Sequence, residues 1–312
     1  MMTLVNHILI QPFVQPYMQR AVAELVLLSI AGAVCGLYVL LRRLAFLAET
    51  LQHSVFPGIA VAYTLQVSLL LGALCAAALT IVLLYFVNRR SALDQDAVLA
   101  LLMSMFFATG VVIVSRGNSY QHDLTTLLFG RVLAVDAAQL WQTALVVLVV
   151  LTLLTALHKE LIARAFDPEG SASQGYSLAL LDAALHVSLA LVVVAAVQAV
   201  GTVLLVAFVI TPVAAARLLH FSIFKTMVVG AFVAITCSWV GLGLSYELSV
   251  RRSVNVASGA SVVLLISAVF ILVSAFVALR SRFGRRDRIH SRRENFSSDH
   301  LPGAHLSSEA SL

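Results

Sequence analysis

Long stretches without aspartate, glutamate, lysine or arginine dominate this chain, and they constrain its fold more than any other feature. They occupy residues 25–41, 50–88, 97–115, 137–158, 183–216, 226–246 and 253–279. A membrane-spanning helix needs about 20 predominantly apolar residues. Lipid offers the backbone no hydrogen-bond partner, so each crossing must be helical or belong to a closed barrel. The runs lack the alternation of barrel strands, so the sequence predicts an all-α polytopic membrane protein.

Two of these runs are too long for a single crossing. We divide the run 50–88 near Gln66-Val67-Ser68, and the run 183–216 at residues 198–202, where Gly201 permits a tight turn. Left whole, the second run would make a helix about 50 Å long at roughly 1.5 Å per residue. The division gives about nine crossings, with eight or ten as alternatives, within one transmembrane domain over residues 1–280.

Charge is scarce and unevenly placed. Charged residues make up 11% of the chain, whereas soluble domains are about a quarter charged. A basic cluster follows the last apolar run, at Arg280, Arg282, Arg285, Arg286, Arg288, Arg292 and Arg293. Beside an apolar segment, such a cluster is typical of a cytoplasmic flank that faces anionic lipid, so we predict no nucleic-acid partner. Because residues 281–312 contain few apolar residues, we expect them to form a disordered cytoplasmic tail.

Other patterns exclude several classes of protein. The three cysteines, Cys35, Cys75 and Cys237, are scattered through apolar runs and form no CxxC pair, which argues against a disulfide framework or a structural zinc site. The sequence contains no Walker A pattern, so we expect ATP to be bound and hydrolysed elsewhere and predict no enzyme activity for this chain. No His-Glu-x-x-His pattern is present, which argues against an intramembrane metallohydrolase.

One stretch places ionisable residues between two apolar runs. In "AETLQHSVFPGIAVAY", residues 48–63, Glu49 and His53 lie one turn apart on a helix that we expect to begin near Leu44. An ionisable group at membrane depth costs at least about 2.5–3.5 kcal/mol, so it is expected to face a cavity, a partner or a substrate path. Carboxylate and imidazole together suit Mn²⁺, Zn²⁺ or Fe²⁺. We expect Pro57-Gly58 to interrupt the helix and expose carbonyl groups beside the pair. An interfacial pair, hydrogen-bonded to each other and wetted from the cytoplasm, is the alternative.

Five segments in order carry a resemblance to a known family. They are "ETLQHSVFPGIAVAY" at 49–63, "DLTTLLFGRVLAVD" at 123–136, "FDPEGSASQGY" at 166–176, "QAVGTVLLVAFVITPVAAARLL" at 198–219 and "NVASGASVVLLISAVFIL" at 255–272. Together the segments resemble the permease subunits of zinc, manganese and iron ABC importers, over about residues 13–280.

The resemblance implies an architecture and a set of partners. It implies the all-helical fold shared with vitamin B12 and siderophore importers, in a bacterial cytoplasmic membrane. Two permeases would pair as a homodimer, two separate ATP-binding subunits would dock on the cytoplasmic side, and an extracytoplasmic metal-binding protein would deliver the ion. The metal ion would be the transported substrate, and no permanently bound cofactor is expected.

The resemblance also assigns the metal path. The family's intramembrane aspartate and histidine fall on Glu49 and His53, and a later family aspartate falls on Asn255. Glu49 keeps the charge with one extra methylene, and Asn255 replaces a carboxylate with a neutral amide. We therefore expect a less negative site, in which Asn255 tunes the metal rather than holding it.

The cytoplasmic segment 159–182 is the expected contact for the ATP-binding subunit. Leu161 and Phe166 lie in a short amphipathic helix, which we expect to end before Asp167-Pro168 because Pro disfavours helix in the residue before it. We predict that Leu161, Phe166, Asp167 and Pro168 couple ATP hydrolysis to transport. A solvated connector is the alternative.

Two rival transport functions stay open at this level. The first is a permease of the same fold for a metal chelate such as a siderophore or a corrinoid. Glu49 and His53 favour a naked ion, because a chelate needs no protein ligands. The second is a proton-coupled carrier that uses Glu49 as a relay.

Overall fold

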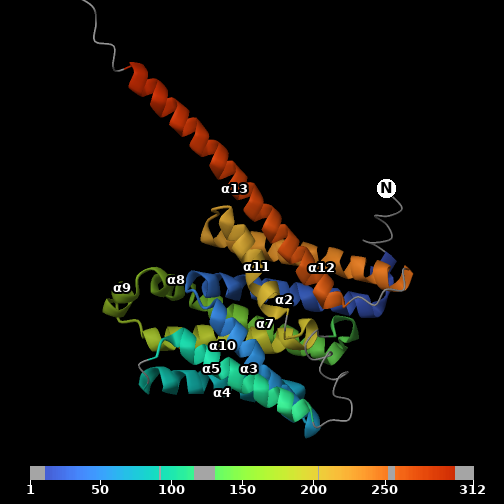
Figure 1. Cartoon of the computed structure of the whole chain (residues 1–312). Coiled ribbons are helices and arrows are strands. Elements are labelled where there is room, and N and C mark those ends of the chain that lie inside the picture. The colour runs from blue at the N-terminus through green and yellow to red at the C-terminus, as the bar shows by residue number, and fades with distance from the viewer. Residues whose placement is uncertain (1–10, 91–92, 116–130, 203, 252–256, 299–312) are drawn as a thin grey trace, which may run out of the picture.

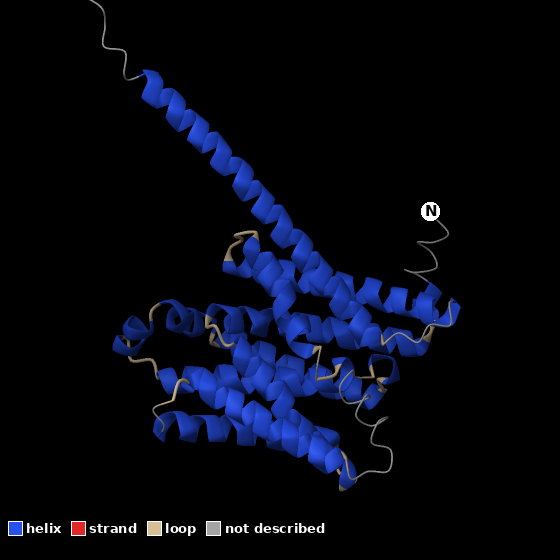
Figure 2. Ribbon diagram, in the orientation of Figure 1, coloured by secondary structure: helices blue, strands red, loops and turns tan. Residues whose placement is uncertain are grey.

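The structure is a computed structural model that describes residues 11–90, 93–115, 131–202, 204–251 and 257–298. These residues form helices and short connections, with no strand among them (Figure 2). Helices longer than ten residues are α2 (Pro16–Leu41), α3 (Ala45–Thr64), α4 (Leu69–Arg90), α5 (Gln95–Val114), α7 (Ala137–Ala156), α10 (Leu178–Val200), α11 (Leu205–Leu218), α12 (Ile223–Arg251) and α13 (Ser258–Ser298). Shorter helices are η1 (Gln11–Val14), η2 (Val132–Ala134), α8 (His158–Phe166) and α9 (Pro168–Ser173). The predicted all-α class is confirmed.

Seven of the described helices are long and apolar enough to cross a membrane: α2, α4, α5, α7, α10, α12 and α13. The chain is therefore a multi-pass membrane protein. The other two long helices differ in length or in polarity, since α11 has 14 residues and α3 carries Glu49, Gln52 and His53. The expected count of about nine crossings stays a prediction that would require both α3 and α11 to cross.

The two divided runs break where the sequence predicts. Helix α3 ends at Thr64 and α4 begins at Leu69, so the first break includes Gln66-Val67-Ser68. Helix α10 ends at Val200, and Gly201 follows it with a φ of 89°. A side chain disfavours that backbone conformation, which explains why glycine occupies the turn.

Helices α2 and α10 contribute much of the buried core, and the other helices pack on either side of them. Figure 1 shows α3, α4 and α5 grouped on one side, and α11, α12 and α13 on the other. The short helices α8 and α9 lie at the end of the bundle where α2 finishes, and the described chain begins at the opposite end (Figure 1). That this end, with α8, is cytoplasmic stays a prediction.

Small residues let α3 approach its neighbours closely. A Cβ atom added to Gly58 of α3 would overlap the carbonyl oxygen of Gly72 on α4. On the other flank, a Cβ on Gly110 of α5 would overlap the ring of Phe56. Close backbone approach at small residues is how helices pack where no hydrophobic drive acts between them. Helix α3 is therefore fixed between α4 and α5.

Helix α13 extends well beyond the rest of the bundle (Figure 1). It runs as one helix from Ser258 to Ser298 and so continues past residue 280, where composition predicts disorder. A helix that is already nucleated can extend at little cost through a segment without proline, which accounts for the difference. That 281–312 acts as a separate tail stays a prediction, and residues 299–312 lie outside the described residues.

Candidate metal site on helix α3

A tight turn between α2 and α3 sets the start of the helix that carries the candidate ligands. The amide of Leu44 donates to the carbonyl of Val39 at 2.8 Å, and the amide of Arg43 donates to Leu40 at 3.3 Å. Arg43 has a φ of 57°, so the end of α2 has the hydrogen bonds and the left-handed residue of a Schellman motif. Helix α3 begins immediately after it at Ala45, which confirms the expected start near Leu44.

Glu49 and His53 project from one face of α3 in its second and third turns. Both residues are half-buried. The His53 ring packs edge-on against Phe107 of α5, with ring centroids 5.4 Å apart and an interplanar angle of 85°. The Nδ1 atom of His53 is buried and has no hydrogen-bond partner among the described residues. The imidazole is thus held in place with a ring nitrogen available, and no hydrogen bond to Glu49 accompanies it in the described part of the chain.

Pro57 does not break helix α3, in contrast to the prediction from the sequence. The expected interruption at Pro57-Gly58 is wrong, because α3 continues without a break from Ala45 to Thr64 with Pro57 inside it. The close contact of Gly58 with Gly72 holds this part of the helix against α4. Proline nonetheless lacks the N–H that would bond to the carbonyl four residues earlier. The carbonyl oxygen of His53 therefore lacks its usual donor four residues on, and it belongs to the same residue as the available imidazole.

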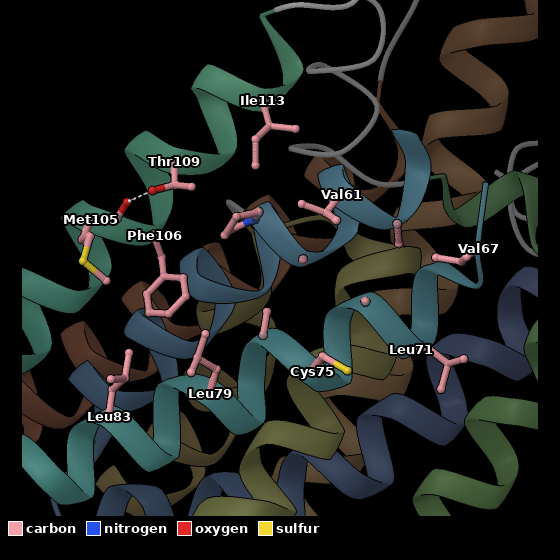
Figure 3. A pocket seen from close by; sticks show the side chains of 15 residues that line it. Val61, Val67, Leu71, Cys75, Leu79, Leu83, Met105, Phe106, Thr109 and Ile113 are labelled. Carbon is pink, nitrogen blue, oxygen red and sulfur yellow. Dashed lines mark hydrogen bonds between the residues drawn. The ribbon is translucent and has the colours of Figure 1, made fainter. Parts of the chain in front are cut away.

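The face of α3 that carries Glu49 and His53 continues into an apolar groove. Pro57 and Val61 follow at the same four-residue spacing and line a cavity of about 570 Å³ between α3, α4 and α5 (Figure 3). Side chains on the α4 and α5 walls include Leu71, Cys75, Leu79, Met105, Phe106 and Thr109. This lining offers little to a hard cation, because the exposed Cys75 thiol is a soft ligand and most of the other side chains are apolar. The polar atoms that suit a metal are concentrated at Glu49 and His53.

The described residues of one chain do not make a full metal site. No group of three or more His, Cys, Asp or Glu side chains comes together in the part of the chain that the structure describes. Asn255, which the sequence predicts to tune the site, lies outside the described residues. In the described residues, the candidate ligands on α3 are therefore the side chains of Glu49 and His53.

A further carboxylate within the bundle escaped the sequence analysis. Glu24 of α2 is fully buried and accepts a hydrogen bond from the Thr143 hydroxyl of α7 at 2.7 Å. Its other oxygen, Oε2, has no partner among the described residues. Glu24 directly precedes the first uncharged run, so a search for charges inside the runs passes over it. It joins α2 to α7 and lies on neither α3 nor the groove.

The segment that we expect to be cytoplasmic forms two short helices joined at Asp167. Helix α8 ends at Phe166, and Asp167 caps α9 by accepting a hydrogen bond from the amide of Gly170 at 2.8 Å. Pro168 takes the first position of α9, where its missing N–H costs nothing. Leu161 is fully buried, whereas the side chain of Phe166 is 63% exposed. The expected helix and turn are present, but Leu161 anchors α8 to the bundle and leaves Phe166 as the exposed apolar residue.

Comparison with known proteins identifies the family of this chain. The ABC 3 transport family matches residues 14–277. The chain belongs to the ABC 3 transport family. The match covers the described helices except most of η1 and the end of α13, and it includes the Glu49–His53 stretch and the α8–α9 segment. The family resemblance drawn from the five sequence segments is confirmed.

The chain is similar to several named metal-transport proteins over most of their length. The chain is 32% identical over 260 residues to the manganese transport system membrane protein MntC of Listeria monocytogenes, covering 83% of this chain and 90% of the relative. It is 32% identical over 266 residues to the manganese import system permease protein ScaB of Streptococcus parasanguinis, covering 85% and 92%. It is also 29% identical over 274 residues to a Haemophilus influenzae protein named "Probable iron transport system membrane protein", covering 88% and 98%.

Solved structures share the fold of this family member. PsaBC from Streptococcus pneumoniae, in complex with Fab, matches with a TM-score of 0.74 and 27% sequence identity, over 83% of this chain and 91% of that chain. An ABC transporter described as of metal-chelate type, in an inward-facing conformation, matches with a TM-score of 0.64 over 86% and 91% of the two chains. Its 16% identity shows the fold alone.

Proposed function

We propose that this chain is the permease subunit through which a divalent transition metal ion is imported by ATP-driven alternating access, with Mn²⁺ as the first candidate. The observation that carries the proposal is the pair of Glu49 and His53 on α3, with a buried, unpartnered imidazole nitrogen and a carbonyl freed by Pro57. Carboxylate, imidazole and carbonyl groups form a mixed ligand set that suits Mn²⁺ and also accepts Zn²⁺ or Fe²⁺. The manganese transport names of the relatives favour Mn²⁺ among these ions.

Alternating access explains why the ligands are few. An ion in transit must be bound strongly enough to enter and weakly enough to leave. Two side chains per protomer meet that need. In the homodimer that we propose, the second copy would contribute an equal set, and Asn255 would tune the affinity from a neutral amide rather than a carboxylate.

A metal-chelate permease of the same fold is the second candidate. The fold-level likeness to a transporter described as of metal-chelate type favours it. Against it, a chelate presents its own donor atoms to the metal and leaves no role for an imidazole whose Nδ1 is already desolvated. The naked ion is therefore the substrate that the described residues of α3 fit better.

The proposed assembly has two further components. Separate ATP-binding subunits dock on the end of the bundle that carries α8, and an extracytoplasmic metal-binding protein delivers the ion at the opposite end. The membrane is the bacterial cytoplasmic membrane, and α13 ends inside the cell. Phe166 supports the docking proposal because it is the exposed apolar residue of a helix whose remaining apolar side chains face inward.

Uptake of Mn²⁺ into proteoliposomes that contain the permease and its ATPase, with ATP inside and the metal-binding protein outside, tests the proposal. His53→Ala is expected to abolish ATP-dependent uptake while the protein still inserts and purifies, because removal of a buried polar group makes insertion no harder. Cys75→Ser is the matched control, since it alters another potential metal ligand in the neighbouring groove. Normal Mn²⁺ uptake by His53→Ala would reject the site. Competition by an iron chelate, but not by free Zn²⁺, would favour the second candidate.

A further inference from the structure

Asp182 holds two arginines from different parts of the chain. The Oδ1 atom of Asp182 lies 2.7 Å from Nη1 of Arg42. Arg164 donates from Nε to Oδ1 at 3.3 Å and from Nη2 to Oδ2 at 3.2 Å, so its contact is two-pronged. The three side chains are only 11%, 29% and 19% exposed for Arg42, Asp182 and Arg164. The bidentate contact of Arg164 fixes geometry more firmly than an exposed ion pair does. The Arg42 contact is a single ion pair between partly buried side chains, and its Nη1 atom makes no hydrogen bond among the described residues.

The three residues come from the elements that a transport cycle must connect. Arg164 lies on α8, Asp182 lies in the first turns of α10, and Arg42 is the C-cap of α2. Arg42 directly precedes the Schellman turn at Arg43 and the start of α3. Because that turn contains no flexible glycine and is closed by two backbone hydrogen bonds, a displacement of Arg42 moves the beginning of α3 with it.

A second contact holds α8 to the same helix end. The Tyr38 hydroxyl of α2 is hydrogen-bonded to Nδ1 of His158 at the start of α8, at 2.6 Å. Tyr38 and Arg42 are four residues apart, so they lie on one face of α2. His158, Leu161 and Arg164 recur at three-residue intervals and hold the inner face of α8 against the bundle, while Phe166 stays exposed. Helix α8 is therefore built to move together with the end of α2.

We propose that Asp182 is a positioning residue that transmits displacement of α8 to the start of α3, through its simultaneous ion pairs with Arg164 and Arg42. This inference rests on the proposed function of α8 as the contact for the ATP-binding subunit. Movement of α8 pulls on Arg164, Asp182 passes the movement to Arg42, and the rigid turn passes it to the helix that carries Glu49 and His53. The network thereby joins the energy source to the metal ligands without touching either ATP or the metal.

Asp182→Asn is a poor first test, because it leaves two partly buried guanidinium groups side by side without their carboxylate. Arg42→Gln and Arg164→Gln each cut one link and leave the other arginine paired with Asp182. The experiment uses the complete complex of permease and ATPase in proteoliposomes, with Mn²⁺ as the transported ion. The measured quantity is the number of Mn²⁺ ions taken up per ATP hydrolysed.

Each single variant is expected to lower this ratio about tenfold, within the range typical of coupling between distant sites. The double variant Arg42→Gln/Arg164→Gln should be no worse than the more affected single variant, because both cut the same path. Asp182→Glu keeps the carboxylate and should retain the ratio to within about twofold. Asp96→Asn, which alters an exposed carboxylate in the first turn of α5, is the matched control and should leave the ratio unchanged.

Three results would overturn the inference. The first is an unchanged ratio of Mn²⁺ to ATP in both single variants. The second is a double variant whose loss of this ratio equals the product of the two single losses. The third is release of the ATPase by Arg164→Gln, which would make Arg164 a docking residue. Phe166→Asp separates this inference from the function on which it rests. If that variant binds its ATPase and transports normally, α8 is not the docking helix. That part of the proposed function then fails, whatever ratio is measured for the arginine variants.

Discussion

Pro57 lies one helical turn after His53 on α3 and deprives the carbonyl oxygen of His53 of its usual donor, the backbone N–H four residues on. Proline inside a helix typically costs about 3 kcal/mol of helix stability relative to alanine. In the described part of α3, this proline follows the only carboxylate–imidazole pair. The proline and the carboxylate–imidazole pair lie on successive turns of the same helix. We propose that the carbonyl without its usual donor takes part in the metal site.

Pro57→Ala therefore separates stability from metal handling. It restores a backbone N–H that can bond to the His53 carbonyl, so we expect a higher melting temperature of the purified permease. If the carbonyl is a ligand, the same variant should bind Mn²⁺ more weakly and take it up more slowly. Thermal unfolding and metal binding, measured on one preparation, test both expectations. A variant that is more stable and transports Mn²⁺ at the unaltered rate would remove the carbonyl from the site.

The contact of Gly58 with Gly72 gives a second prediction. Gly58→Ala places a methyl group where the Gly72 carbonyl lies, so α3 and α4 must separate. Overpacking of this kind costs roughly 1–3 kcal/mol, which we expect to appear as a lower melting temperature in detergent. Gly32→Ala is the matched control, because its new methyl group would meet Val209 at an ordinary 3.6 Å. At Gly32 the better helix propensity of alanine should raise the melting temperature. Equal effects of the two variants on the melting temperature would argue against the tight contact between Gly58 and Gly72.

Asn255 gives a third prediction, which rests on the sequence. The family resemblance implies a carboxylate at this position, and Asn255 would leave the proposed site with less negative charge. Asn255→Asp is expected to strengthen retention of Mn²⁺ and to change the preference between Mn²⁺ and Zn²⁺. Elemental analysis of the purified complex after exposure to both ions measures the change, with Asn255→Ser as the neutral control. An unchanged metal profile would assign Asn255 to packing.

Local signals in the sequence predicted much of the fold. The breaks at residues 66–68 and 198–202, the start of α3 near Leu44, and the end of α8 before Asp167 all follow from run length, glycine or proline. These features depend on residues that are neighbours in the chain. The prediction at Pro57 failed because packing of Gly58 against α4 keeps the helix intact, and that packing depends on a second helix.

Contacts between distant residues could not be predicted from one sequence. Asp182 meets Arg42, although the two lie far apart in the chain and neither belongs to a recognisable motif. Glu24 and Thr143 are likewise separated by 119 positions. The apolar pattern of α8 included both Leu161 and Phe166, and only the packed structure shows that Leu161 faces the core.

The exposure of Phe166 gives the last prediction, on the contact with the ATPase. Phe166→Asp places a charge at a side chain that is 63% exposed, so the variant should fold and insert normally. If Phe166 enters a groove of the ATPase, burial of an unpaired carboxylate there should weaken the complex by several kcal/mol or uncouple hydrolysis from transport. Co-purification of the ATPase with the tagged permease, followed by Mn²⁺ uptake, measures both effects.

The matched control for this prediction is Phe224→Asp. Phe224 is 72% exposed near the start of α12, and it lies outside the α8–α9 segment. It reports what a new charge on an exposed phenylalanine does without contact to the proposed docking helix. Loss of ATPase from Phe166→Asp but not from Phe224→Asp would locate the contact at α8. Retention of the ATPase and of normal uptake by Phe166→Asp would instead identify the segment as a solvated connector, because a contact that transmits force cannot tolerate a buried, unpaired charge.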